Sequence, residues 1–211
     1  MFDTYADLHE MERALLGHIK AKSLDIRHGT CIDWATGERA EMPLEFDLNK
    51  TLLSPHAALV GEILYERTKD LAIDALGGAA EAIPLVVATV IAYHHHERTM
   101  EGFFVRERKD HGTGQSVEGH VKPGMKVAVV DATFSTGQDA IKTVETLATS
   151  GYEVASFIAL VDRMGLATPL MNAHGIATVQ VVFSWSDLET PGWPSREEWR
   201  PQRMEEQMVW P

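Results

Sequence analysis

Hydrophobic residues recur along the chain in two periods, which predict helices alternating with strands. Helical spacing of apolar residues predicts helices over residues 5–22, 55–69, 81–95, 138–150 and 164–174. Short, continuous apolar runs predict strands over residues 44–48, 71–76, 102–106, 126–131, 153–162 and 178–183. Strands that alternate with helices in this way indicate an α/β fold with a mainly parallel sheet.

Local signals set the expected ends and surroundings of several elements. Gly77 and Gly78 are expected to end the strand before them, and the segment from Ala132 to Gly137 is expected to be a turn. The helix from Glu81 to His95 is apolar on most sides, which predicts a place in the interior. The segment from Glu107 to Glu118 is polar and lacks periodicity, which predicts a loop.

The predicted organisation is one domain over residues 1–187, with an arm over residues 188–211. Within the domain, residues 1–53 form a helix and a small hood, and residues 54–187 form the core. The arm contains four of the nine prolines and three of the five tryptophans. Its tryptophans are expected to pack on the body or on a sister subunit, and the alternative is a tail that binds a separate partner.

Charge and composition narrow the classes of function. The chain has 211 residues, of which 45% are hydrophobic, and a net charge of −12, which is the balance of an acidic globular protein. No broad basic field is present, so neither nucleic acid nor an anionic membrane surface is an expected partner. The longest apolar stretch, from Ala82 to Ala92, is too short to cross a bilayer.

The N-terminal segment and the cysteine content predict a cytoplasmic protein. The first residues, MFDTYADLHEMER, lack the basic and apolar regions of a secretory signal. Cys31 is the only cysteine, so no disulfide forms within the chain, and nothing beside it completes a catalytic triad. His94, His95 and His96 are consecutive on a predicted helix and point about 100° apart, which predicts a solvated helix end with no metal site.

The strongest chemical signal lies in residues 127–140, VAVVDATFSTGQDA. An apolar strand ends at an acid, Asp131, and a turn with Ser135, Thr136 and Gly137 leads into a helix. Such a turn directs backbone N–H groups and the helix dipole at one point, which favours a phosphate. An acid at the strand end accepts hydrogen bonds from ribose hydroxyls. The alternative is an ordinary turn with a hydroxyl cap.

This segment resembles the 5-phosphoribosyl 1-diphosphate (PRPP) signature of the type I phosphoribosyltransferases, and orotate phosphoribosyltransferases resemble the chain most. Three further segments match in order: GGAAEAIPL at 77–85 is similar to their diphosphate turn, FFVRERKDHGTG at 103–114 to their catalytic loop, and VDR at 161–163 to a strand end with an orotate-contacting arginine. The resemblance implies a twisted, mainly parallel sheet flanked by helices, with a small N-terminal hood.

The resemblance also implies an activity and roles for residues. Such enzymes transfer phosphoribose from PRPP to a small anionic base, here orotate, with substrate-bound Mg²⁺, and act as homodimers in pyrimidine nucleotide biosynthesis. The implied catalytic residues are Lys109, His111, Asp131 and Arg106. The implied phosphate and ribose site comprises Asp131, Ser135, Thr136, Gly137, Gln138 and Asp139. The implied diphosphate turn is Gly78, Ala79 and Ala80, and the implied base contacts are Arg163 and Arg27.

Several positions depart from the family pattern. Ala132 replaces the second acid of the signature, and Glu81 stands where a lysine is usual. The loop VRERKDHG is one residue shorter than the family loop, so Arg106 takes either of two positions. Each lost charged contact weakens ligand binding by roughly 1.5–3 kcal/mol. Two alternatives to an orotate enzyme therefore stay open: a regulatory homologue that binds PRPP or nucleotides without catalysis, and a transferase for another base.

Overall fold

The structure is a computed structural model that describes residues 5–26, 30–32, 39–41, 44–106 and 115–189. Three residues with predicted roles, Arg27, Lys109 and His111, lie outside the described residues. The arm does so as well from residue 190 onward, so its predicted packing stays a prediction.

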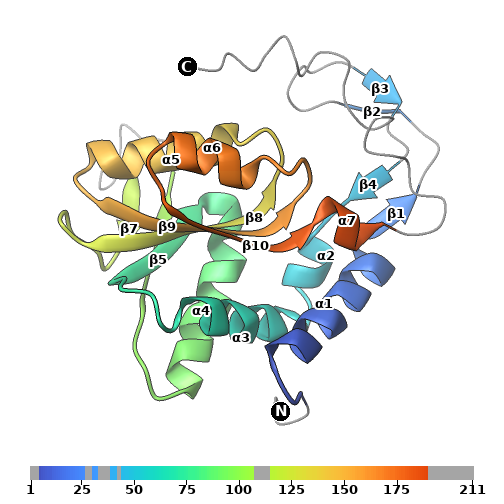
Figure 1. Cartoon of the computed structure of the whole chain (residues 1–211), viewed down its shortest axis with the longest axis horizontal. Coiled ribbons are helices and arrows are strands. Elements are labelled where there is room, and N and C mark those ends of the chain that lie inside the picture. The colour runs from blue at the N-terminus through green and yellow to red at the C-terminus, as the bar shows by residue number, and fades with distance from the viewer. Residues whose placement is uncertain (1–4, 27–29, 33–38, 42–43, 107–114, 190–211) are drawn as a thin grey trace.

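A six-stranded sheet forms the centre of the molecule (Figure 1). Its order is β10-β9-β8-β5-β6-β7, and all neighbours are parallel except β7, which runs antiparallel to β6 at one edge. The strands are β5 (Ala75–Ala79), β6 (Glu101–Val105), β7 (Val117–Gly119), β8 (Lys126–Phe134), β9 (Glu153–Asp162) and β10 (Thr178–Ser184). The predicted α/β class with a mainly parallel sheet is confirmed.

Helices cover both faces of this sheet (Figure 1). One layer contains α1 (Leu8–Lys22), α3 (Ala57–Thr68) and α4 (Ile83–His95), and the other contains α5 (Gln138–Thr149) and α6 (Ala167–Ala173). Short helical segments are α2 (Asn49–Leu52), the 3-10 turn η1 (Ala80–Ala82) and α7 (Trp185–Leu188). In the part of the chain that the structure describes, no helix combines the length and the hydropathy that a membrane crossing needs.

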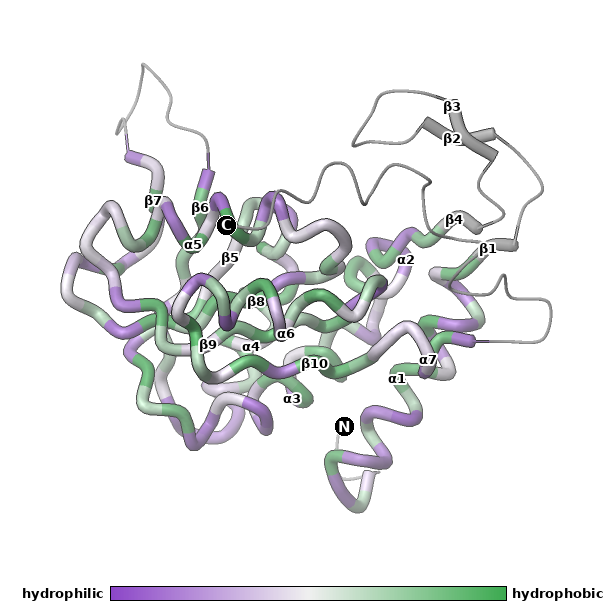
Figure 2. Tube along the Cα trace, turned by 45° about the horizontal axis from the view of Figure 1, so that its top comes forward, coloured by the Kyte–Doolittle hydropathy of each residue, from purple (hydrophilic) through white to green (hydrophobic). Residues whose placement is uncertain are grey.

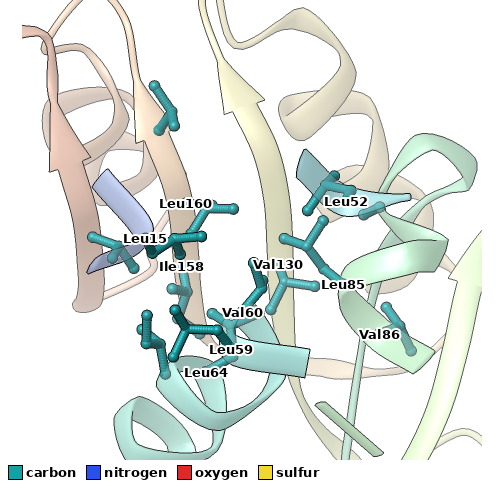
Figure 3. Packing of buried hydrophobic residues seen from close by; sticks show 14 of the residues in the cluster. Leu15, Leu52, Leu59, Val60, Leu64, Leu85, Val86, Val130, Ile158 and Leu160 are labelled. Atoms are coloured by element: carbon teal, nitrogen blue, oxygen red, sulfur yellow. The ribbon is translucent and has the colours of Figure 1, made fainter. Parts of the chain in front are cut away.

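Alternation along the central strands divides the core into two clusters, because successive side chains of a strand point to opposite faces. Val130, Ile158 and Leu160 face α1, α3 and α4, as Figure 3 shows. Val129 and Phe157 belong to the second cluster, which α5 and α6 cover. Figure 2 shows that α1 carries both hydrophilic and hydrophobic positions.

The hood consists of two antiparallel strand pairs. β1 (Leu24–Ile26) pairs with β4 (Leu44–Phe46), and β2 (Thr30–Ile32) pairs with β3 (Arg39–Glu41). β1 follows directly after Ser23, the residue that ends α1. Ser23 is joined to α2, because its buried hydroxyl oxygen lies 2.7 Å from that of Thr51.

Two strand predictions were wrong at the positions that matter most. β5 does not end before Gly77 and Gly78 but contains both. Backbone carbonyl oxygens of the neighbouring strands lie so close to these two residues that a Cβ would collide with them, so glycine serves here to let strands approach and not to end the strand. β8 runs on through Phe134 instead of turning at Ala132, because parallel pairing with β9 continues to Asp162.

Two helix predictions also need correction. α3 starts at Ala57, with His56 as its N-cap, so Pro55 precedes the helix and does not occupy its first position. α4 is not wholly interior, because Val87 and Ile91 are about half exposed, at 51% and 50%. The C-terminal end of α4 is not simply solvated either, because His96 Nε2 lies 2.7 Å from a carboxylate oxygen of Glu62, a buried residue of α3.

Candidate active site at the carboxyl edge of the sheet

The order of the strands reverses between β5 and β8. The chain moves outward from β5 to β6 in one direction and from β8 through β9 to β10 in the other. Ligands of open α/β sheets bind beyond the carboxyl ends of the strands where the direction reverses in this way. The turn after β5 and the turn after β8 therefore lie on either side of the expected binding crevice.

The turn after β8 leads into a helix, α5, whose N-terminus has no side-chain cap from the described residues. Ser135 and Thr136 lead to Gly137, which has a left-handed backbone (φ +81°) and serves as the N-cap of α5. A Cβ on Gly137 would stand 2.7 Å from Cζ of Phe134, so both its backbone and its packing require glycine. Among the described residues, no side chain forms a cap hydrogen bond to this end of α5. Its first N–H groups thus remain available to an anion.

Asp131 lies next to this turn, three residues before the end of β8. One of its carboxylate oxygens accepts a hydrogen bond from the N–H of Thr133 at 3.1 Å. Burial raises the pKa of Asp131 to about 6, and the negative charges of Asp139 and Glu81 add to the rise. The hydrogen bond from Thr133 opposes it. Asp131 is therefore a carboxylate that ionises near neutral pH at the mouth of the crevice.

The last residues of β5 and the turn that follows them lie close to the backbone of β8. A Cβ on Gly78 would collide with the carbonyl oxygen of Val130, so glycine is the residue that allows the two strands to approach there. Ala79 ends β5, and Ala80 begins η1. Glu81 follows on the exposed side of η1, close enough to act on the charge of Asp131.

Arg163 follows β9 at the same edge of the sheet and is contacted there by residues of two other strands, β8 and β4. Its N–H donates to the carbonyl of Phe134 at 2.9 Å, which joins the turn after β8 to the end of β9. Its guanidinium carbon lies 5.8 Å from the ring centroid of Phe46, at the end of the hood strand β4. The contact with Phe46 was not predicted, because no local pattern links residues 117 positions apart in the sequence.

Asp162 was also missed, and it shapes the turn that carries Arg163. This carboxylate is buried and accepts hydrogen bonds from four backbone N–H groups, those of Met164, Gly165, Leu166 and Ala167, at 2.8–3.3 Å. The acid thus fixes the chain between β9 and α6. An acid at the end of an apolar strand, followed by Gly165, is a signal that could have predicted such a turn.

Arg106 is already paired within the described residues. Its Nε lies 3.2 Å from a carboxylate oxygen of Glu118, and its Nη2 contacts the same oxygen. Because β6 and β7 are antiparallel neighbours, this pair joins the two strands that flank residues 107–114. Arg106 thus links the end of β6 to β7. Its predicted catalytic role stays a prediction.

The acids of the crevice do not form a metal cage. Among the described residues, no three His, Cys, Asp or Glu side chains gather at a spacing that holds a metal ion. Mg²⁺ needs few protein ligands when phosphate oxygens and water fill its coordination sphere. The residues present therefore fit an ion that the phosphate groups of a ligand would carry.

Known proteins resemble the chain over most of its length, although no family model matches it. An orotate phosphoribosyltransferase of Streptomyces avermitilis is 35% identical over 173 residues, which cover 80% of this chain and 92% of that protein. The crystal structure of Mycobacterium tuberculosis orotate phosphoribosyltransferase with Fe(III) dicitrate superposes with a TM-score of 0.72 at 27% identity and covers 85% of this chain and 99% of that one. The same enzyme solved with PRPP gives a TM-score of 0.68 at 25% identity, covering 84% and 98%. Identity over these lengths, together with the shared fold, shows that the chain belongs to the orotate phosphoribosyltransferase family.

Proposed function

We propose that the chain transfers phosphoribose from PRPP to orotate with Mg²⁺, forming orotidine 5′-phosphate and diphosphate for pyrimidine nucleotide synthesis. The observation that carries this proposal is the uncapped N-terminus of α5 beside Asp131 at the reversal point of the sheet. The solved relative that binds PRPP has the same fold, which supports PRPP as the ligand of this crevice.

The proposed ribose 5-phosphate site lies along the turn after β8. The 5′-phosphate accepts hydrogen bonds from the N–H groups of the turn and of the first turn of α5, with hydroxyls of Ser135 and Thr136 beside it. Asp131 accepts hydrogen bonds from the ribose hydroxyls. The binding residues are Asp131, Ser135, Thr136, Gly137, Gln138 and Asp139.

The reaction breaks the bond between ribose C1 and the diphosphate oxygen while C1 bonds to a ring nitrogen of orotate. Positive charge develops on the sugar, and negative charge develops on the diphosphate, so donors directed at the diphosphate stabilise the transition state. The turn of Gly78, Ala79 and Ala80 supplies backbone N–H groups there. Bound Mg²⁺ would neutralise part of the diphosphate charge.

Four basic or ionisable residues complete the proposed site. Arg163 contacts the anionic base from the end of β9, and Arg27 contacts it from the hood. Lys109 and His111 act on the diphosphate from the segment between β6 and β7. The pairing of Arg106 with Glu118 positions the strands from which that segment departs.

We further propose that the chain acts as a homodimer and that the partner covers the exposed side of α4. An apolar groove of about 360 Å³ lies there, between α2, α3 and α4, with Leu53, Ile83, Val87 and Ile91 exposed along it. Exposed apolar patches of this kind mark protein interfaces. Because Cys31 is the only cysteine, the reducing cytoplasm suits the protein.

One observation favours a second candidate, a homologue that binds PRPP or nucleotides without turnover. Glu81 and Asp139 place two further negative charges near Asp131, and all three repel a diphosphate. An assay of Mg²⁺- and PRPP-dependent loss of orotate decides between the two. Loss of orotate in this assay supports the transferase. Binding of PRPP measured by calorimetry, with no loss of orotate, would instead support a homologue that binds PRPP without catalysis.

A further inference from the structure

Two histidines stack where the N-terminal helix meets the core. The rings of His18 on α1 and His56 at the N-terminus of α3 lie 3.4 Å apart between centroids, with their planes 15° from parallel. His56 is fixed in place, because its N–H donates to the hydroxyl of Ser54 at 3.1 Å. The buried Nε2 of His18 has no hydrogen-bond partner among the described residues.

The surroundings of this pair favour neutral rings. Burial lowers the pKa of His18, and the neighbouring His56 and Lys22 lower it further. Lys22 is on the same helix and His56 is on the facing element, so every charged group acting on His18 is cationic or becomes cationic in acid. Two neutral imidazoles stack favourably, whereas two imidazolium ions at this separation repel each other.

The histidine pair lies at the base of the hood. α1 runs directly into β1, and β1 pairs with β4 through Leu24 and Phe46. The N–H of Asp47 donates to the carbonyl of Ser23 at 2.9 Å, which ties the end of β4 to the end of α1. Phe46 in turn contacts Arg163, so a chain of contacts leads from the end of α1 through β4 to that arginine.

We propose that the stacked His18–His56 pair is an acid-sensitive clasp that holds α1 and the hood strands β1 and β4 on the core. Protonation of the pair opens the clasp and frees the hood. The sign follows from linkage: the folded form resists protonation of His18, so the contribution is complete above the ordinary histidine value of 6.5 and is lost as pH falls below it. The proposal does not depend on the activity proposed above.

Hydrogen–deuterium exchange measured by mass spectrometry tests the clasp. After correction for intrinsic exchange, a fall from pH 7.5 to 5.5 is expected to speed exchange of α1 by about tenfold relative to α5, because local opening of α1 becomes easier once the pair is protonated. His18→Gln and His56→Gln should each remove most of this acceleration. His120→Gln, at a histidine whose side chain is 93% exposed, should retain it.

Equal acceleration of α1 and α5 in the wild type would overturn the proposal, as would an unchanged pH response in both variants. If a variant does not fold, the wild-type protein still decides the matter through NMR titration of its histidine rings. The His18 ring should titrate below the ordinary histidine value of 6.5, and titration at or above that value would contradict the clasp.

Discussion

The backbone carbonyl of Val130 on β8 packs directly against the Cα of Gly78 on β5, where any side chain would collide with it. The contact joins the proposed diphosphate turn to the strand that carries Asp131. We expect Gly78→Ala to destabilise the fold by about 1–3 kcal/mol, since an added methyl group forces the strands apart. Urea unfolding measures this, and PRPP affinity should fall as well.

Gly17→Ala is the matched control for that substitution. Gly17 lies within α1, and nothing comes within 4 Å of a Cβ built on it. Alanine is favoured over glycine in a helix interior by up to about 1 kcal/mol, so this variant should be as stable as the wild type or more so. Equal stability of the two variants would show that the approach of Val130 does not restrict position 78.

Asp131 should make both stability and ligand binding depend on pH. Burial and two nearby carboxylates raise its pKa to about 6, above the value of 3.8 expected when unfolded. Its stabilising contribution is therefore complete below about pH 4 and is lost as pH rises through 6. Asp131→Asn should accordingly stabilise the protein at pH 8, by on the order of 2 kcal/mol, and have little effect at pH 4.

Ligand binding should follow the opposite course, because the ribose hydroxyls of PRPP are proposed to donate to the ionised carboxylate. PRPP affinity of the wild type should decrease below pH 6, whereas Asp131→Asn should bind weakly and with less pH dependence. Removing the acceptor is expected to cost roughly 1–3 kcal/mol of binding at pH 8. Wild-type affinity that is identical at pH 5 and pH 8 would place the ribose away from Asp131.

Glu81→Lys should improve PRPP binding. Glu81 is exposed on η1, and its negative charge, which raises the pKa of Asp131, would also repel the diphosphate of the proposed substrate. Replacing it reverses one charge, so we expect the KM for PRPP to decrease by about threefold to tenfold and the pKa of Asp131 to move down. Glu145→Lys makes the same charge change at an exposed position on α5 and should have little effect. Similar KM changes in both variants would indicate a general field effect.

Val87→Asp should convert the proposed dimer into monomers. Val87 is 51% exposed and lines the apolar groove beside α4, so a carboxylate there would be buried without a partner in the interface. Ala148→Asp introduces the same charge on α5, on the opposite side of the sheet, and should remain dimeric. Sedimentation velocity distinguishes the two states, and a monomeric wild-type protein would refute the interface.

Hydrophobic periodicity predicted the elements whose bounds follow from their own sequence. It failed where contacts with a neighbouring strand determine where an element begins or ends. β9 was predicted with its observed bounds, Glu153–Asp162, because a continuous apolar run is typical of a strand buried on both faces. β5 was displaced because glycine is usually a strand breaker, whereas here Gly77 and Gly78 admit the backbones of Phe103 and Val130. No sequence signal reports that approach.

The features of the candidate site also fall into those that the sequence predicts and those that depend on the tertiary structure. The hydroxyl-rich turn from Ser135 to Gly137 was predictable because its signal is local and lies between a strand and a helix. The pairs between Arg106 and Glu118 and between Arg163 and Phe46 were not, because each requires the tertiary arrangement. The raised pKa of Asp131 also depends on burial and on Glu81 and Asp139, which the fold brings near.

The most direct test is the stoichiometry of diphosphate release when the wild-type protein receives PRPP, orotate and Mg²⁺. We expect one diphosphate for each orotate consumed, with release that stops when either orotate or Mg²⁺ is omitted. Tight binding of PRPP by the same preparation with no diphosphate formed would contradict it and leave a protein that retained the crevice of its family without the reaction.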